Sequence, residues 1–444
     1  MKTHAPLVFA ALLAVACGGP EADPTSDDGG GISVPDAGGT LPLGGSPDAG
    51  SGASGPLGLT VDGQVIGTDG LAPDHVISVV ITGKSPVAVT DGHFSVPDVT
   101  APYDLTIIDG TANSAIVYQG LTRANPVVLA ATTSRARTSV ASLSGRISGG
   151  TYPQGTNQYT AVVLDRAGGG QTAWTDASGN YSISGFRWGG DTSFTGRVYA
   201  LQVETNSALL PARYLGFAST TASIASGGTF SGMNLGLAPV TSSSVSGVVH
   251  APSGYTPAGR KLWILFGESG IEFKDASTSD GFSYVTPNAP QGFAAVVAFA
   301  GKPSAAAVHY EPFNGFSASG AALNLVAAPE AVLPTDGATA VDGQTQFSWT
   351  PFAGGVHAVA FMPVNGTGPV IQIITTATSA HLPDLSAYGM TLPSGTKYEW
   401  HAEGLGPAAS MDAAAQPSFR AQWNFTSTSG IDWGTATSRT FTAR

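Results

Sequence analysis

Charge and cysteine are both scarce in this chain of 444 residues. Charged side chains make up 11% of it, against about 25% in ordinary soluble domains, and the formal net charge is −12. Lys and Arg form no cluster after the first 20 residues, which excludes a nucleic-acid partner, because such a partner needs basic groups to neutralise its phosphates. Cys17 is the only cysteine, so the domains that follow it have no disulfide and depend on their cores for stability.

Long apolar runs and familiar catalytic motifs are missing as well. Beyond the N-terminal residues no apolar stretch reaches about 18 residues, so we expect no membrane-spanning helix. The eight histidines are scattered without an HExxH motif, and there is no G-x-S-x-G elbow, P-loop or dinucleotide fingerprint. The turn at residues 175–180 (TDASGN) offers alternating oxygen groups for calcium, but this alternation is also typical of a hairpin turn. We expect no metal, no cofactor and no catalytic residue.

One enzymatic alternative stays open. An envelope hydrolase could use carboxylates gathered beside a histidine for acid–base chemistry, on a long loop of the C-terminal region. The candidate groups for such a site are His401, Glu403, Asp412 and Asp432.

Glycine, proline and alternating apolar segments are what the sequence has in quantity. It contains 59 Gly and 30 Pro, and 42% of its residues are hydrophobic, which is enough for several cores. Segments such as SVVITG, TAVVLD and KLWILFG are typical of strands, whereas a helical period of 3.6 residues is hard to find. The sequence therefore predicts an all-β protein of tandem β-sandwich modules.

The N-terminus has the pattern of an export signal. Lys2 precedes an apolar run at residues 6–15, and small or medium residues at 14–16 come directly before Cys17. This resembles the lipobox of bacterial lipoproteins, which implies cleavage before Cys17 and a diacylglycerol thioether on its sulfur; Ala14 stands where that family usually carries Leu. The alternative is an ordinary secretory signal with Cys17 near its cleavage site by chance.

Residues 17–56 read as a flexible, lipid-anchored tether, because Gly, Ser, Pro, Asp, Thr and Ala dominate them and bury little apolar area. The resemblance implies a place in the bacterial cell envelope. Gly18 stands where Asp would signal retention at the inner membrane, which favours the outer membrane.

Three stretches share one pattern. Each opens with a glycine in a short alternating strand (Gly63, Gly145 and Gly247) and later has an Asp-Gly or Ser-Gly turn followed by an aromatic residue. The third copy differs, since Phe282 follows Gly281 immediately, so we expect its register or turn to differ by one residue. The pattern resembles carboxypeptidase regulatory-like (transthyretin-related) modules, which implies β-sandwiches without catalysis.

The final part of the chain has a different pattern. Trp349 in FSWTP and Tyr398 in LPSGTKYEWHA stand where fibronectin type III domains carry their core tryptophan and corner tyrosine. The region therefore resembles such a domain. Residues 421–427 or 438–444 could supply its last strand; we favour the latter, which leaves 404–434 as a long loop.

The predicted division is a signal peptide (1–16), a tether (17–56), three regulatory-like sandwiches (57–133, 140–240 and 243–327) and a fibronectin-like sandwich (329–444). A non-enzymatic envelope protein, with its modules in a row as a stalk, scaffold or adhesin, fits this organisation best. Its partners would be the membrane, through the lipid, and a glycan or an envelope protein. Trp188 and Trp433, each beside glycine at an expected loop tip, are the candidate ligand contacts. The sequence does not indicate an oligomeric state.

Overall fold

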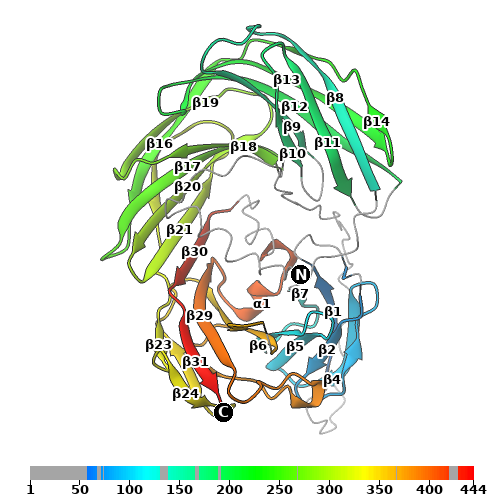
Figure 1. Cartoon of the computed structure of the whole chain (residues 1–444), viewed down its shortest axis with the longest axis vertical. Coiled ribbons are helices and arrows are strands. Elements are labelled where there is room, and N and C mark those ends of the chain that lie inside the picture. The colour runs from blue at the N-terminus through cyan, green and yellow to red at the C-terminus, as the bar shows by residue number, and fades with distance from the viewer. Residues whose placement is uncertain are drawn as a thin grey trace, which may run out of the picture.

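Figure 1 shows a computed structural model of the chain, which describes residues 58–67, 72–73, 75–130, 139–165, 170–188, 192–267, 269–366, 368–419 and 429–444. The all-β prediction is confirmed, because strands dominate every part of the described chain. The predicted signal peptide, Cys17 and the tether lie outside the described residues.

The first repeat has a plan that the next two follow. Its strands are β1 (Leu59–Ile66), β2 (Ser78–Ile81), β3 (Val87–Ala88), β4 (His93–Val99), β5 (Tyr103–Asp109), β6 (Ser114–Leu121) and β7 (Val127–Leu129). One sheet has the order β4-β1-β7, with β7 parallel to β1, and the second has the order β3-β2-β5-β6. Alternate side chains of both sheets pack between them, as in a sandwich.

The second and third repeats have the same strand order. The second comprises β8 (Ser139–Gly149), β9 (Gln158–Asp165), β10 (Gln171–Trp174), β11 (Asn180–Trp188), β12 (Ser193–Thr205), β13 (Pro211–Ala225), β14 (Thr229–Phe230) and β15 (Leu235–Leu237). The third comprises β16 (Ser242–His250), β17 (Thr256–Phe266), β18 (Ser269–Asp275), β19 (Gly281–Pro287), β20 (Phe293–Lys302), β21 (Ala305–Pro312) and β22 (Ala318–Asn324). Their sheets run β11-β8-β14 with β10-β9-β12-β13, and β19-β16-β22 with β18-β17-β20-β21.

The shared sequence pattern corresponds to one cross-strand pair. Gly63 lies opposite Phe94, Gly145 opposite Tyr181 and Gly247 opposite Phe282. The register in the third repeat is thus the same as in the others, and only its turn differs. The backbone N–H of Val249 donates to the carbonyl of Asp280. The corresponding bonds in the other repeats run from Val65 to Gly92 and from Ile147 to Gly179, so Asp280 occupies the position of these two glycines.

The C-terminal region forms a fourth sandwich. Its strands are β23 (Ala331–Leu333), β24 (Ala338–Val341), β25 (Gln346–Trp349), β26 (Val356–Pro363), β27 (Val370–Thr375), β28 (Ser379–His381), β29 (Lys397–Gly406), β30 (Ile431–Ala436) and β31 (Arg439–Ala443). Trp349 and Tyr398 are buried in its core. β31 pairs with β29, as expected for the closing strand. Residues 404–434 are not simply a loop, since they include the short helix α1 (Met411–Ala414) and part of β30.

The modules do not follow one another in a row. β21 of the third repeat pairs with β30, and β27 pairs in parallel with β6 of the first repeat. Within the described residues, these contacts join three modules into one sheet of 14 strands. The C-terminal sandwich therefore lies between the first and third repeats, and α1 packs beside β6 (Figure 1).

Candidate functional site: a polar groove on the first repeat

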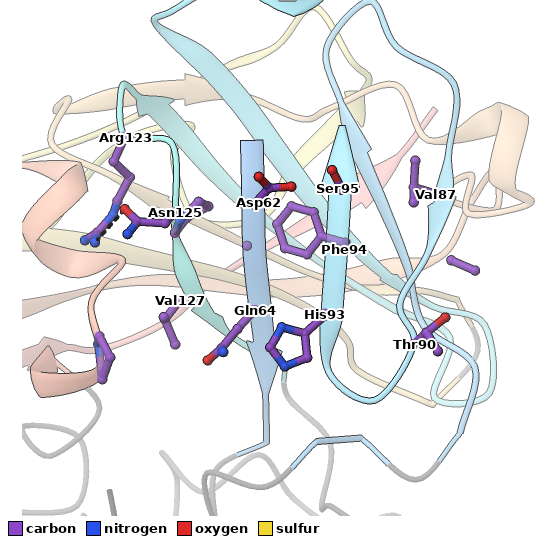
Figure 2. A pocket seen from close by; sticks show the side chains of 14 residues that line it. Asp62, Gln64, Val87, Thr90, His93, Phe94, Ser95, Arg123, Asn125 and Val127 are labelled. Atoms are coloured by element: carbon purple, nitrogen blue, oxygen red, sulfur yellow. Dashed lines mark hydrogen bonds between the residues drawn. The ribbon is translucent and has the colours of Figure 1, made fainter. Parts of the chain in front are cut away.

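An open groove of about 850 Å³ lies on the outer face of the β4-β1-β7 sheet (Figure 2). Strand alternation places its polar side chains there. Val61, Val65, Phe94 and Val96 point into the core, so the intervening residues point to solvent. The outward residues that line the groove from β1 and β4 are Asp62, Gln64, His93 and Ser95.

These side chains form two cross-strand pairs. Asp62 lies opposite Ser95, and Gln64 lies opposite His93, so the four groups stand side by side on adjacent strands (Figure 2). The strands that carry them are fixed by the packed core beneath, in which the Phe94 ring covers Gly63. The groove therefore presents carboxylate, amide, imidazole and hydroxyl groups from fixed positions on the backbone.

The far wall is held by the C-terminal sandwich. The guanidinium of Arg123 donates to Asn125 Oδ1 (3.3 Å) and to the backbone oxygen of Asp412 (2.8 Å). The Asp412 carboxylate accepts the backbone N–H groups of Thr122 (2.8 Å) and Arg123 (3.1 Å). Pro417, which follows α1, also lines the groove. Two modules thus build this wall, and the contact between Thr122 and Asp412 that joins them links residues 290 positions apart in the chain.

The chemistry of the groove suits a small polar ligand. Its volume falls within the range of roughly 300–1,000 Å³ that is common for ligand sites. Its lining offers both donors and acceptors, while Val87 and Val127 add small apolar surfaces. This site was not among the sequence predictions. Alternation in TVDGQVI and HFSV is enough to place Asp62, Gln64, His93 and Ser95 on one face of the sheet. The wall formed with the C-terminal sandwich is visible only in the fold.

Neither predicted ligand-contact tryptophan lies at a loop tip. Trp188 is the last residue of β11, is 5% exposed, and stacks on Phe186 with ring centroids 5.7 Å apart. Trp433 is in β30, is 7% exposed, and belongs to the core that includes the first repeat. The expected exposed positions are wrong, because both tryptophans belong to strands and their rings turn into the core.

A more exposed aromatic pair lies elsewhere. Trp174 on β10 is 51% exposed and meets Tyr159 of β9, which is 39% exposed, edge to face with centroids 6.1 Å apart. One signal for this pair is visible in the sequence, since Trp174 directly precedes the TDASGN turn.

The four candidate hydrolase groups do not form one site. His401 and Glu403 are neighbours on one face of β29, with Nε2 and Oε1 3.3 Å apart. Asp432 is instead hydrogen-bonded to His309 (2.8 Å). Thr435 lies opposite Glu403 on the neighbouring strand, and Asp432 comes three residues before Thr435, so its side chain projects from the other face of the sheet. Asp412 is engaged with the first repeat.

The candidate calcium turn is a tight hairpin. The Asp176 carboxylate accepts the backbone N–H groups of Ser178 and Asn180, each at 2.9 Å, and the side-chain amide of Asn180. The Asn180 amide and these backbone groups lower the pKa of Asp176. Across the described ranges, His, Cys, Asp and Glu form no group of three that could hold a metal ion. No described helix is both long and apolar enough to cross a membrane.

Comparison with known proteins gives distant structural matches only. No family model and no curated protein matches the sequence. A leucine-rich repeat protein from Bacteroides thetaiotaomicron matches 42% of this chain at 9% identity and a TM-score of 0.18, and the chain spans about a quarter (26%) of its length. A tetra-tandem repeat from the extending region of a large adhesion protein matches 78% of this chain and 96% of its own, at 15% identity and a TM-score of 0.15.

A streptococcal ancillary pilin matches 60% of this chain and 99% of its own, at 8% identity and a TM-score of 0.15. Scores this low do not support inferences about function.

Proposed function

We propose that this chain is a non-enzymatic binding protein of the bacterial cell envelope, which uses the groove on its first repeat to hold a glycan. Cleavage before Cys17 and lipidation of its sulfur would attach it to a membrane, the outer one in a Gram-negative cell. Residues 17–56 would separate the folded modules from the lipid. In this proposal the three repeats are regulatory-like sandwiches and the last module is fibronectin-like.

The groove is the observation that carries the proposal. Sugars are recognised through many hydroxyl groups, and the groove offers carboxylate, amide and imidazole partners in fixed positions. Because these side chains project from paired strands, binding requires ordering of the side chains but not of the backbone. The scattered placement of His401, Asp412 and Asp432 supports binding without catalysis.

The test is glycan-array binding followed by calorimetry with the purified chain. The variant Gln64→Ala removes an amide from the centre of the groove, and we expect it to weaken binding about tenfold, the effect of one lost hydrogen-bonding group. Gln344→Ala, at an exposed turn of the C-terminal sandwich, is the matched control. Equal affinity of both variants, or binding of an envelope protein without any glycan, would contradict the proposal.

The anchor is tested separately. We expect Cys17→Ala to move the protein from the membrane fraction to the soluble fraction, because the variant lacks the sulfur that accepts the lipid. Unchanged partitioning with the membrane would refute lipidation at this residue.

A further inference from the structure

The outer edge of β13 is unlike the corresponding edges of the other repeats. In each repeat the four-stranded sheet ends on an equivalent strand, which is β6 in the first repeat, β13 in the second and β21 in the third. β27 pairs with β6, and β30 pairs with β21. Among the described residues, no strand pairs with the outer side of β13 at residues 219–225. The equivalent edge is thus paired in the first and third repeats and, within the described residues, unpaired in the second.

Backbone groups point outward along this open stretch. The backbone N–H of Ser226 donates to the carbonyl of Thr192, which directly precedes β12. Because backbone groups alternate in direction along an antiparallel strand, those of the even-numbered residues of β13 bond to β12 and those of the odd-numbered residues face away from it. Phe217 follows this rule, since its backbone exchanges two hydrogen bonds with Ala238, at 2.9 and 3.0 Å, on the outer side. By the same alternation, the residues whose N–H and C=O groups face solvent are Ser219, Thr221 and Ser223.

The usual protections of a sheet edge are missing here. Residues 218–226 (ASTTASIAS) contain no charge and no proline, and their register with β12 is unbroken from Gly216 to Ala225. The opposite edges of the three sheets are protected. β3 has two residues, β10 has four, and β18 carries Glu272 and Lys274.

We propose that this edge of β13 pairs with the same strand of a second copy of the chain, antiparallel about a twofold axis at Thr221. The pairing would place Thr221 opposite the partner's Thr221, and Ser219 opposite the partner's Ser223. Short hydroxyl side chains suit such cross-strand neighbours, and two four-stranded sheets would become one of eight. β13 lies in the part of the molecule remote from the C-terminal sandwich, so the pairing leaves the groove free (Figure 1).

A second copy is the occupant that fits best. Of the residues outside the described part, 18–57 are rich in Gly, Pro and Asp and make a poor strand, and 131–138 carry two arginines. Residues 420–428 include the strand-like segment 421–427, but α1 and β30 on either side of them belong to the C-terminal module, which is remote from β13 (Figure 1). The C-terminal sandwich of another copy already uses β27 and β30 for its own first and third repeats. An uncharged edge also allows contact between two copies whose formal net charge is −12 without bringing carboxylates together.

The first test measures the oligomeric state of the purified full chain by sedimentation velocity, from about 1 to 100 µM, the range in which a single strand pair would associate. We expect a reversible dimer. Thr221→Glu and Thr221→Lys should each raise the dimer dissociation constant about tenfold or more, because like charges then face each other. Mixing the two variants should restore dimers. Ser182→Glu, exposed on β11 of the same repeat, controls for the added charge.

The second test uses the absence of other thiols after Cys17→Ala. In that background, oxidation of Thr221→Cys should give a disulfide-linked dimer, whereas Ser182→Cys should not. A chain that stays monomeric throughout the concentration range, or equal dimer yields from both thiol variants, would overturn the proposal. Failure of the mixed charge variants to dimerise would overturn the pairing at Thr221.

Discussion

The imidazole Nδ1 of His309 on β21 lies 2.8 Å from a carboxylate oxygen of Asp432 on β30, across the junction of the third repeat and the C-terminal sandwich. Glu311 approaches the other ring nitrogen at 3.1 Å. The imidazole is 11% exposed, so the two carboxylates neutralise a charge that is largely removed from water. This ion pair therefore makes the junction sensitive to pH.

We expect the junction to weaken at alkaline pH. Burial alone would lower the pKa of His309, but hydrogen bonds to Asp432 and Glu311 outweigh it and raise the pKa from 6.5 to about 9. The added stability is therefore fully present below pH 6.5 and is lost as the pH rises through about 9. We expect the free energy of unfolding to fall by on the order of 2 kcal/mol. A tenfold change in proton affinity corresponds to about 1.4 kcal/mol, and the partial exposure of both carboxylates reduces the effect of the full pKa shift.

Hydrogen exchange of β21 and β30 amides at pH 6.5 and 9.5 measures this effect, after correction for the intrinsic rate. His309→Gln should remove the difference between the two pH values. His381→Gln, at an exposed position on β28, is the control. A pH dependence that survives His309→Gln would assign the effect to another group.

Gly63→Ala should destabilise the first repeat by about 1–3 kcal/mol, the usual cost of overpacking a core. A Cβ at this position would lie 2.2 Å from Phe94 Cζ and 2.9 Å from the oxygen of Pro126. Urea unfolding and exchange of β1 amides measure the loss. Gly110→Ala is the matched control, because a Cβ there meets nothing within 4 Å. If the clash with the Phe94 ring is the cause, the double variant Gly63→Ala/Phe94→Ala should lose less stability than the sum of the losses in the two single variants.

Gly179 and Gly281 look equivalent in sequence, but alanine should affect them differently. Gly179 has φ +89° and a Cβ there would lie 2.7 Å from the oxygen of Ile147, so alanine should cost about 1–2 kcal/mol or more. Gly281 lacks a left-handed φ and has open space around it, so alanine should be nearly neutral. Thermal unfolding of the two variants is the comparison, and equal losses would contradict the register assigned to the third repeat.

Asp412→Ala should loosen the contact between α1 and the first repeat. It leaves the N–H groups of Thr122 and Arg123 without their acceptor, at a cost of about 1–3 kcal/mol. Burial raises the pKa of Asp412, but hydrogen bonds from Thr122 and Arg123 lower it on balance, so the contact should also weaken as the pH falls below about 4.

Faster exchange of the amides at the end of β6 would show this loosening. Asp384→Ala, whose carboxylate accepts the backbone N–H of Ser386 in its own turn, is the control. Unchanged exchange at the end of β6 in Asp412→Ala would mean that the carboxylate does not hold the two modules together.

The local rules of the fold were readable in the sequence. Alternating apolar residues specify strands whatever surrounds them, and glycine opposite an aromatic residue marks each repeat, as Gly145 and Tyr181 do. The same alternation did not reveal which way Trp188 and Trp433 face, because glycines beside a ring are as compatible with a strand as with a loop tip.

The sequence by itself determined that this protein is a set of β-sandwiches without disulfides, because side-chain alternation and turn residues act over a few positions. Only the tertiary structure decided how those sandwiches combine. Strand edges offer the same backbone groups whatever their side chains, so the pairing of β6 with β27 and of β21 with β30 depends on which edges the fold leaves exposed. The wall of the groove follows from that arrangement, since Arg123 and Asp412 meet only after distant modules join.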